Sequence, residues 1–373
     1  MTEGNQYIQG LDEYIRQGEP QEQERGRAWQ TAIGLQEVDG LKTSPYLLET
    51  ARRHIEGDIT IDEVKQLIDS YYKSQAGRKE VEGERTEEAD KVSARITELL
   101  QEQTFNFSPA QLTSIHRRLF EGIYKFAGFI RNYNITKREW VLRGETVYYA
   151  SADTITETLE YDMGLERNYS YEGKSINEAI SHLTRFCANL WQIHAFGEGN
   201  TRSTAVFMIK YLKTLGFKVN NDLFATNSWY FRNALVRANY SNLQEGITET
   251  TVFLEHFFRN MLLGETTPLR NREMHLDWET ETPSTKIGIQ SAKKTAQSAN
   301  FALSLPSKCK NCTLEEIAVL KIIQQNPSAK QTFIAKEIGK SERTVKSITA
   351  RLTEKGIIKR SKGKGSDWVI IYD

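Results

Sequence analysis

The most informative part of the sequence is a short stretch between two apolar segments, His194-Ala195-Phe196-Gly197-Glu198-Gly199-Asn200-Thr201-Arg202-Ser203-Thr204. Before it, apolar residues repeat at steps of three and four from Ile176 to Trp191, which predicts a helix that ends near Ile193. After it, residues 205–212 are apolar nearly all round, as is typical of a buried helix. That second helix should stop at Leu215-Gly216. The stretch is therefore expected to lie between two helices of a mainly α-helical domain.

Several residues of this stretch suit chemistry on a phosphate. A helix that begins near Asn200 offers unpaired amides to an anion, and Arg202 in its first turn adds a positive charge. Glu198 is a hard oxygen ligand of the kind that Mg²⁺ prefers, and His194 is a candidate general base. Together they indicate phosphoryl or nucleotidyl transfer. On the residues alone, an ordinary turn with a capping histidine remains the alternative.

The stretch resembles the motif of the Fic (Fido) family, H-x-F-x-[DE]-G-N-G-R-x-x-R. The matching residues are His194, Phe196, Glu198, Gly199, Asn200 and Arg202. Similarity to family patterns extends over about residues 45–263, and includes residues 126–131 and the segment Phe231-Arg232-Asn233-Ala234-Leu235. The resemblance implies a Fic helical core with a β-hairpin flap. It also implies an enzyme, a protein adenylyltransferase (AMPylator), that transfers AMP from ATP to a Ser, Thr or Tyr hydroxyl of a target protein.

The resemblance also implies roles for individual residues. His194 would be the catalytic base, Phe196 would pack beneath the loop, and Glu198 would hold Mg²⁺. The positions implied to bind phosphate are Gly199, Asn200, Thr201 and Arg202. A flap over about residues 140–149, expected as a short hairpin within residues 138–150, would align the target as an added strand and cover the nucleotide through Gly144, Glu145, Thr146 and Val147. Phe231 and Asn239 fall where the family contacts adenine.

Two positions depart from the family pattern. Thr201 replaces the second motif glycine, which should cost little at the start of a helix. Ala205 stands where the family has a second arginine for the terminal phosphate. Its absence puts the efficiency or the nucleotide preference of the reaction in doubt, and Arg232 and Arg237 are candidate substitutes.

A second resemblance concerns regulation. Residues 52–57, Arg-Arg-His-Ile-Glu-Gly, are similar to the inhibitory-helix motif of the family, whose glutamate blocks the terminal-phosphate pocket. The match implies that Glu56 restrains the enzyme. However, Arg52 stands where Ser or Thr is usual, and the usual arginine partner is the one that Ala205 replaces.

Residues 313–373 resemble a winged helix-turn-helix and hold 12 Lys and Arg against 7 Asp and Glu. Thr313 and Glu316 form a capping box for a helix over 314–325, and further helices fit residues 331–338 and 342–355. The candidate DNA contacts lie on the third helix and in the wing: Arg343, Lys346, Lys359, Lys362 and Lys364. Winged helices also dock proteins and form dimers, so DNA binding is one of two readings.

Composition limits the remaining classes of protein. The 373 residues contain 49 Lys and Arg and 49 Asp and Glu, which argues against a chain that coats nucleic acid or a membrane along its whole length. No apolar run reaches the roughly 18 residues of a membrane span. With no visible secretory signal and only three cysteines, the sequence fits a cytoplasmic setting.

The expected organisation is an N-terminal helical region over 1–105, with the inhibitory helix near 45–57, a Fic core over 106–263, a linker over 264–312 and the winged helix over 313–373. The alternative function is a DNA-binding transcriptional regulator whose Fic core senses a nucleotide and is only weakly active. The expected partners are ATP, Mg²⁺, a target protein bound through the flap, and DNA. The oligomeric state stays open, a homodimer included.

Overall fold

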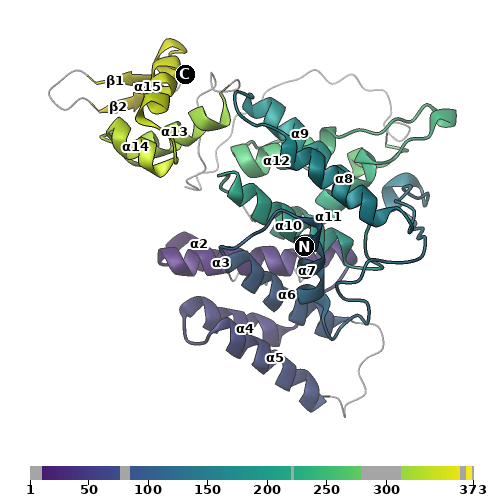
Figure 1. Ribbon diagram of the computed structural model, residues 1–373. Helices are drawn as coiled ribbons and strands as arrows, with labels where there is room; N and C mark the ends of the chain where they lie inside the picture. The colour runs from purple at the N-terminus through teal and green to yellow at the C-terminus, as the bar shows by residue number, and fades with distance from the viewer. Residues whose placement is uncertain (1–10, 76–84, 220–221, 279–311, 362–366, 372–373) are drawn as a thin grey trace. The chain divides into compact units, whose positions relative to one another are not determined.

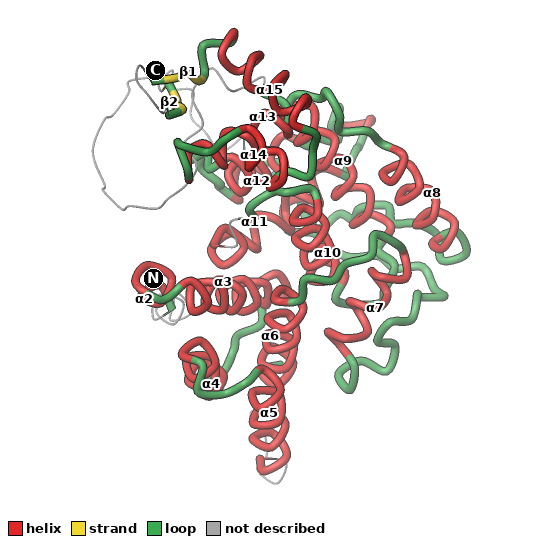
Figure 2. The backbone as a smooth tube through the Cα atoms, turned by 60° about the vertical axis from the view of Figure 1, so that its left-hand side comes forward, coloured by secondary structure: helices red, strands yellow, loops and turns green. Residues whose placement is uncertain are grey.

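The computed structural model describes residues 11–75, 85–219, 222–278, 312–361 and 367–371. The chain divides into two compact units. The first comprises residues 1–167, 186–262 and 267–283, and the second comprises residues 168–185, 263–266 and 284–373. Both are mainly helical, as expected (Figures 1 and 2). Within the described ranges, no helix has the length and apolar character needed to cross a membrane.

A series of α-helices and 3₁₀ helices precedes the winged helix in the sequence. They are α2 (Asp12–Gln17), α3 (Pro20–Gly34), η1 (Leu35–Asp39), α4 (Pro45–Glu56), α5 (Ile61–Gln75), α6 (Thr86–Gln101), α7 (Pro109–Phe120), η2 (Trp140–Leu142), α8 (Ile155–Asn168), α9 (Ile176–Ile193), α10 (Asn200–Thr214), α11 (Asp222–Ala238), η3 (Leu243–Glu245), α12 (Val252–Leu263) and η4 (Asn271–Met274). Elements η1 to η4 are short 3₁₀ helices.

Helix α10 is the central helix that the apolar pattern predicts. Every residue from Asn200 to Leu212 is buried, and the helix packs against α6, α7 and η1. It ends at Thr214, close to the predicted stop at Leu215-Gly216. The stretch 194–199 therefore joins the end of α9 to the start of a helix that is fixed on all sides.

The N-terminal segment contributes to this same packing. Residues 1–40 show only weak periodicity, yet α3 packs against α6 and α11, and η1 packs against α10. At Gly34 a Cβ atom would lie 2.3 Å from the Cα of Ala225, so the glycine lets α3 and α11 approach closely. Polar side chains of this segment, Gln30, Thr31 and Gln36, are buried. Because these buried residues are polar, the hydrophobic pattern of the sequence does not reveal helix α3.

The flap differs from the β-hairpin expected over residues 138–150. The structure has the short helix η2 there, followed by Arg143 and Gly144 with positive φ angles, and no regular strand in this described segment. The two arms of the flap are still joined by a backbone hydrogen bond, in which the Glu139 amide donates to the Glu145 carbonyl at 2.9 Å. Val141 and Leu142 are buried at the turn, which explains why the apolar run forms a tight buried turn rather than a strand.

The second unit contains the winged helix, with α13 (Leu314–Gln325), α14 (Gln331–Glu337), α15 (Glu342–Glu354), β1 (Ile358–Arg360) and β2 (Trp368–Ile370). The strands pair antiparallel, with Lys359 opposite Val369. The capping box of Thr313 and Glu316 is present, which confirms the predicted start of α13. Each predicted helix of this module lies within one residue of its observed bounds.

Candidate active site

His194 directly follows α9 in a left-handed conformation, with φ at 49°. Its Nδ1 lies 3.3 Å from the carbonyl oxygen of Trp191, so Nδ1 is the nitrogen that carries the proton. Nε2 is then an unprotonated acceptor, and it has no hydrogen-bond partner among the described residues. Burial, and then the charge of Lys137, lower the pKa of His194 well below its ordinary value. The imidazole is therefore a neutral base at pH 7.

Aromatic side chains enclose this base. The ring of Tyr149 lies 4.2 Å from the imidazole between centroids, and the ring of Trp191 lies 5.2 Å away. His194 is consequently only 3% exposed. The hydroxyl of Tyr149 donates to Glu139 at 3.4 Å, which keeps the tyrosine ring over the histidine. In this conformation Nε2 itself is buried.

Glu198 is the carboxylate nearest to the start of α10. One of its oxygens accepts from the Gly199 amide at 3.2 Å, and both lie 3.3 Å from the Nζ of Lys137. Burial raises the pKa of Glu198, but the charge and hydrogen bonds of Lys137, the Gly199 amide and the Arg202 charge together keep that pKa below the ordinary value. Among the described residues, no group of three or more His, Cys, Asp or Glu side chains gathers as metal ligands. One ionised carboxylate fits a Mg²⁺ ion that takes its other ligands from substrate phosphates and water.

The residues after Glu198 use their side chains to build the loop. Gly199 has φ at 76°, and a Cβ atom there would lie 2.4 Å from the ring of Phe120. Asn200 accepts from the Phe196 amide at 2.9 Å and donates to the Phe196 carbonyl at 2.7 Å. Thr201 accepts from the indole nitrogen of Trp191 at 3.0 Å. The hydrogen-bond donors that can still bind a phosphate at this end of α10 are the backbone amides of its first turn.

Arg202 lies in a closed group of charges rather than at a phosphate site. It is 0% exposed, and its Nη2 lies 2.7 Å from Glu88 and 2.8 Å from Asp39. Its Nη1 donates to the side chain of Gln36 at 3.0 Å, and the guanidinium lies 4.8 Å from the centre of the Phe120 ring. In this structure, the predicted phosphate-binding arginine is an internal ion-pair partner that connects α10 to η1 and α6.

Two supporting residues received no role from the sequence. His116 on α7 accepts from the Gly128 amide through Nδ1 at 2.8 Å, so its Nε2 donates to the Glu198 carbonyl at 2.9 Å. Its ring also stacks on Phe196, with 3.7 Å between centroids, which matches the expectation that Phe196 packs beneath the loop. Burial lowers the pKa of His116 to about 4, so the ring stays neutral.

Arg131 is the second of these supports. Its Nε donates to the His194 carbonyl at 2.8 Å, while its terminal nitrogens donate to the carbonyls of Tyr133 and Ala150. It thus ties the catalytic loop to both arms of the flap. The segment 126–131 is part of the family resemblance, which is the signal in the sequence that could have pointed to Arg131.

The flap is fixed to α11 by buried charges. Glu139 is 0% exposed and accepts from both terminal nitrogens of Arg232, at 2.7 and 3.1 Å. Of the predicted nucleotide-covering residues, Gly144 and Glu145 are exposed, Thr146 is half-buried and Val147 is buried. Arg232 is therefore occupied by the flap and does not replace the missing second motif arginine here.

The two predicted adenine contacts have other environments. Phe231 is 0% exposed and packs on Phe224 and Phe257, with centroids 5.1 and 5.0 Å away. This places Phe231 in the core, where a nucleobase has no access. Asn239 is half-buried and donates to the carbonyls of Ala188 and Leu235 at 3.0 and 2.9 Å.

Glu56 lies at the end of α4, away from the motif. It is exposed and accepts a hydrogen bond from the hydroxyl of Tyr14. Helix α4 packs against α3 and α5, whereas α10 packs against α6, α7 and η1. Both ribbon views show α3 between α4 and α10 (Figures 1 and 2). Two carboxylates of the N-terminal region, Asp39 and Glu88, do reach the motif helix through Arg202.

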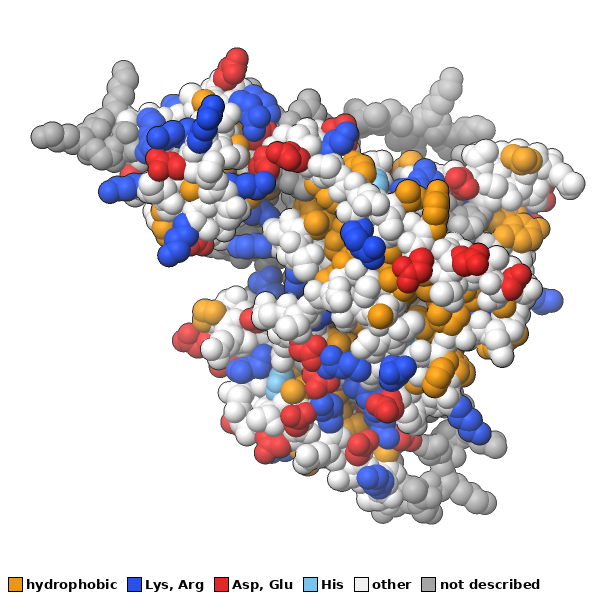
Figure 3. Space-filling view, viewed as in Figure 1, with side chains coloured by type: hydrophobic (Ala, Val, Ile, Leu, Met, Phe, Trp, Pro, Cys, Tyr) orange, Lys and Arg blue, Asp and Glu red, His pale blue; other side chains and the backbone are white. Residues whose placement is uncertain are grey.

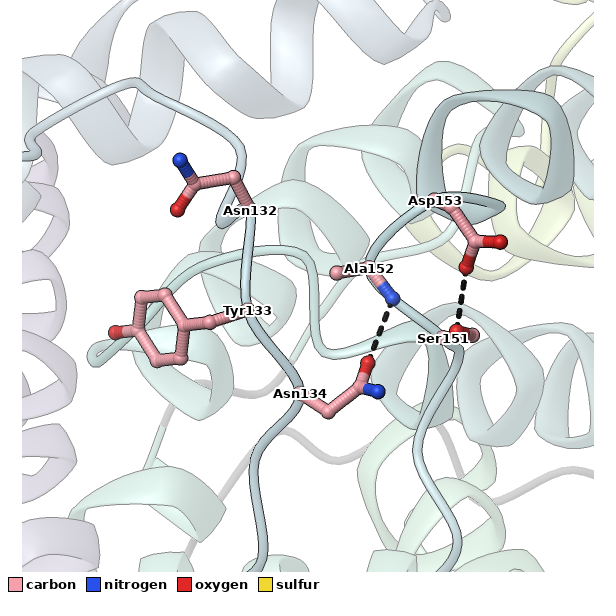
Figure 4. Close-up of a pocket in the computed structure, with 6 residues that line it drawn as sticks. All are labelled: Asn132, Tyr133, Asn134, Ser151, Ala152 and Asp153. Atoms are coloured by element: carbon pink, nitrogen blue, oxygen red, sulfur yellow. Dashed lines mark hydrogen bonds between the residues drawn. The ribbon is translucent and has the colours of Figure 1, made fainter.

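A surface pocket of about 320 Å³ lies at the base of the flap (Figure 4). Its lining residues are Asn132, Tyr133, Asn134, Ser151, Ala152 and Asp153. Asn134 accepts from the Ala152 amide at 2.9 Å and so joins the two arms. No predicted site residue lines this pocket, although Arg131 directly precedes it.

The winged helix carries its own basic surface. Arg343, Lys346 and Lys359 are exposed, and Lys and Arg side chains are numerous on the face of this module shown in Figure 3. Lys346 pairs with Glu342 at 3.1 Å. Lys362 and Lys364 fall outside the described residues, so the wing contacts expected from them are not placed.

Comparison with known proteins gives matches to two regions of this chain. The model of the Fic/DOC family matches residues 106–212, and the model of winged helix-turn-helix DNA-binding domains matches residues 316–359. A protein adenylyltransferase of Bartonella henselae is 25% identical over 178 residues, which are 45% of this chain and 31% of that protein. The chain thus matches about a third of the length of this curated relative.

Two solved structures are also similar. The N-terminal FIC domain of the Bep8 protein from Bartonella sp. 1-1C is 20% identical, with a TM-score of 0.37 over 46% of this chain and 81% of that one. A Fic family protein from Desulfovibrio desulfuricans G20 is 13% identical, with a TM-score of 0.43 over 100% of this chain and 97% of that one. On the family models, residues 106–212 are a domain of the Fic/DOC family, and residues 316–359 are a winged helix-turn-helix domain.

Proposed function

We propose that this protein transfers AMP from ATP to a hydroxyl side chain of a target protein. The family of the domain and the printed name of the Bartonella henselae relative support this class of reaction. The observation that carries the proposal is the state of His194. Its Nε2 is an unprotonated acceptor without a partner among the described residues, only four positions before Glu198 and directly ahead of α10.

In this reaction, individual residues of the chain have distinct roles. His194 Nε2 takes the proton of the target Ser, Thr or Tyr hydroxyl, whose oxygen bonds to the α-phosphorus of ATP while pyrophosphate leaves. The first amides of α10 hold phosphate oxygens. Glu198 would hold Mg²⁺, which when bound offsets the negative charge of the phosphates. Arg131 and His116 fix the loop through the carbonyls of His194 and Glu198.

The flap supplies the target's position in this proposal. An extended target segment would lie along the arm that follows Gly144 and pair with it through main-chain hydrogen bonds. Tyr148 on this arm is 81% exposed, so a target side chain has an aromatic surface to contact. Tyr149, the next residue, turns away from His194 as the target hydroxyl enters.

The position of the label on ATP tests the reaction class. The full-length protein is incubated with Mg²⁺, a cell lysate and ATP labelled on either the α- or the γ-phosphate. Transfer of AMP labels protein from α-labelled ATP only. Labelling from γ-labelled ATP above that of lysate alone would indicate phosphoryl transfer, and no label above that of lysate alone from either nucleotide would reject the enzyme in favour of a nucleotide-sensing regulator.

A second function, DNA binding, is proposed for the winged helix because its third helix exposes Arg343 and Lys346. With about four phosphate contacts, log affinity should fall against log salt with a slope near −3.6. The double variant Arg343→Ala, Lys359→Ala should reduce that slope by about 1.8 in gel shifts. No retardation at low salt would leave the module as a protein-docking or dimerisation element. ATP and DNA as partners fit the expected cytoplasmic setting.

Restraint of this activity by Glu56 rests on the match at residues 55–57 alone. The structure offers a different N-terminal contact to the motif helix, through Asp39 and Glu88.

A further inference from the structure

Lys137 lies on the extended segment that leads into the flap, and its side chain reaches the motif. Its Nζ is 3.3 Å from each carboxylate oxygen of Glu198. The pair lies at the open side of the site, with side-chain exposures of 27% for Lys137 and 33% for Glu198. Both groups can therefore change partners without leaving a buried charge behind.

Three other cations around the motif are occupied by groups of the fold. Arg202 pairs with Asp39 and Glu88 in a closed cluster. Arg131 donates to backbone carbonyls, and Arg232 pairs with the buried Glu139. Lys137 differs from these three because its partner, Glu198, is itself expected to turn to a metal ion once the nucleotide is bound.

We propose that Lys137 is a phosphate-binding residue of this site and supplies the positive charge that Ala205 does not. The inference rests on the proposed function, since it needs a nucleotide at the start of α10. Without nucleotide, the ammonium and the Glu198 carboxylate neutralise each other. With the phosphates and a metal ion bound, Glu198 would hold the metal ion, and the Lys137 ammonium would be free to bind a phosphate oxygen.

The chain offers a matched control in the adjacent residue. Arg138 follows Lys137 on the same extended segment and is exposed. Because successive side chains of an extended segment point to opposite faces, Arg138 should face away from the motif. Lys137→Met and Arg138→Met remove the same charge from neighbouring positions, so a general electrostatic effect of the flap would appear in both.

Calorimetric titration of the full-length variants with ATP and Mg²⁺, and separately with adenosine, tests the inference without turnover. Lys137→Met should weaken ATP binding by about tenfold to a hundredfold, the effect of one hydrogen bond to a charged group. Adenosine binding and the melting temperature should not change. Lys137→Arg should restore most of the ATP affinity, and Arg138→Met should bind ATP like the wild-type chain.

The contrary outcomes separate the two proposals. If the wild-type chain binds ATP and Lys137→Met binds it equally well, Lys137 is not a phosphate ligand and this inference is overturned alone. The same holds if Lys137→Met weakens adenosine as much as ATP, because the role is then structural. If the wild-type chain binds no ATP, the proposed function itself fails.

Discussion

The two halves of the motif loop, residues 194–198 and residues 199–202, differ in how far their polar side chains are already engaged by the fold, although they are consecutive in sequence. In the first half, Nε2 of His194 has no partner among the described residues, and the Glu198 carboxylate pairs with the partly exposed Lys137. In the second half, Asn200 and Thr201 are bonded to the loop, and Arg202 is buried in ion pairs. The first half is built to exchange partners with a substrate, and the second is built to hold the first in place.

This difference predicts that substitutions in the two halves fail in different ways. A change in the first half should remove chemistry and leave the fold intact. A change in the second should destabilise the fold, and any loss of activity should follow from that.

The largest expected effect is on chemistry. His194→Ala should reduce transfer by roughly 10²–10⁴-fold, because the target hydroxyl loses its general base. The melting temperature should change little. Initial rates from α-labelled ATP, with a thermal melt of each protein, measure both quantities. Undiminished transfer by the variant would remove His194 from the mechanism.

The next effect is on stability and belongs to the second half. Arg202→Met should lower the free energy of unfolding by about 3 kcal/mol, because the half-buried Asp39 loses its cation and the buried Glu88 keeps only the partly exposed Arg85. Urea unfolding measures the loss, with the exposed Arg138→Met as the control for removing one arginine. A stable variant that has lost only ATP affinity would instead restore Arg202 to the role of phosphate ligand.

The pH dependence of kcat/KM tests the state of the base. Burial and then Lys137 lower the pKa of His194 well below its ordinary value, so the imidazole in the free enzyme is deprotonated through the neutral range. The value of kcat/KM should therefore stay flat as the pH falls from 8 to about 6.5, and should decline only in more acidic solution. A decline centred at the ordinary histidine pKa would contradict the buried, neutral state.

The smallest expected effect concerns Glu56, which lies outside both halves. Glu56→Gly should change transfer by less than about twofold, as for an ordinary surface substitution. The reason is that Glu56 is exposed and bonded to Tyr14 rather than to the motif. A clear rise in activity at low ATP concentration would show that Glu56 restrains the enzyme, as its sequence context implies.

Much of the fold follows from the sequence because apolar spacing and caps are local signals. The buried helix α10, the winged helix and the capping box at Thr313 all appear where the pattern puts them. Helix α3 does not, because its buried face includes the polar residues Gln30 and Thr31, which interrupt the apolar spacing. The flap does not form the strands that its apolar run predicts, because Val141 and Leu142 are buried in a turn.

The candidate site, like the fold, can be predicted from the sequence only in part. Its motif residues can be found from spacing and resemblance, but the partners of Arg202 are 114 residues away at Glu88 and 166 residues away at Gln36. Nothing local in the sequence reports that this arginine is already paired. The contact between Lys137 and Glu198, 61 residues apart, is hidden for the same reason.

The central claim, that the first half of the loop transfers AMP to protein, is tested most directly by mass spectrometry of a lysate. Wild-type protein and His194→Ala are each incubated with the lysate, ATP and Mg²⁺, and modified peptides are sequenced. The account predicts peptides that carry one added AMP group on a Ser, Thr or Tyr hydroxyl with the wild-type protein and none with the variant. A different added group, or the same AMP peptides with both proteins, would contradict it.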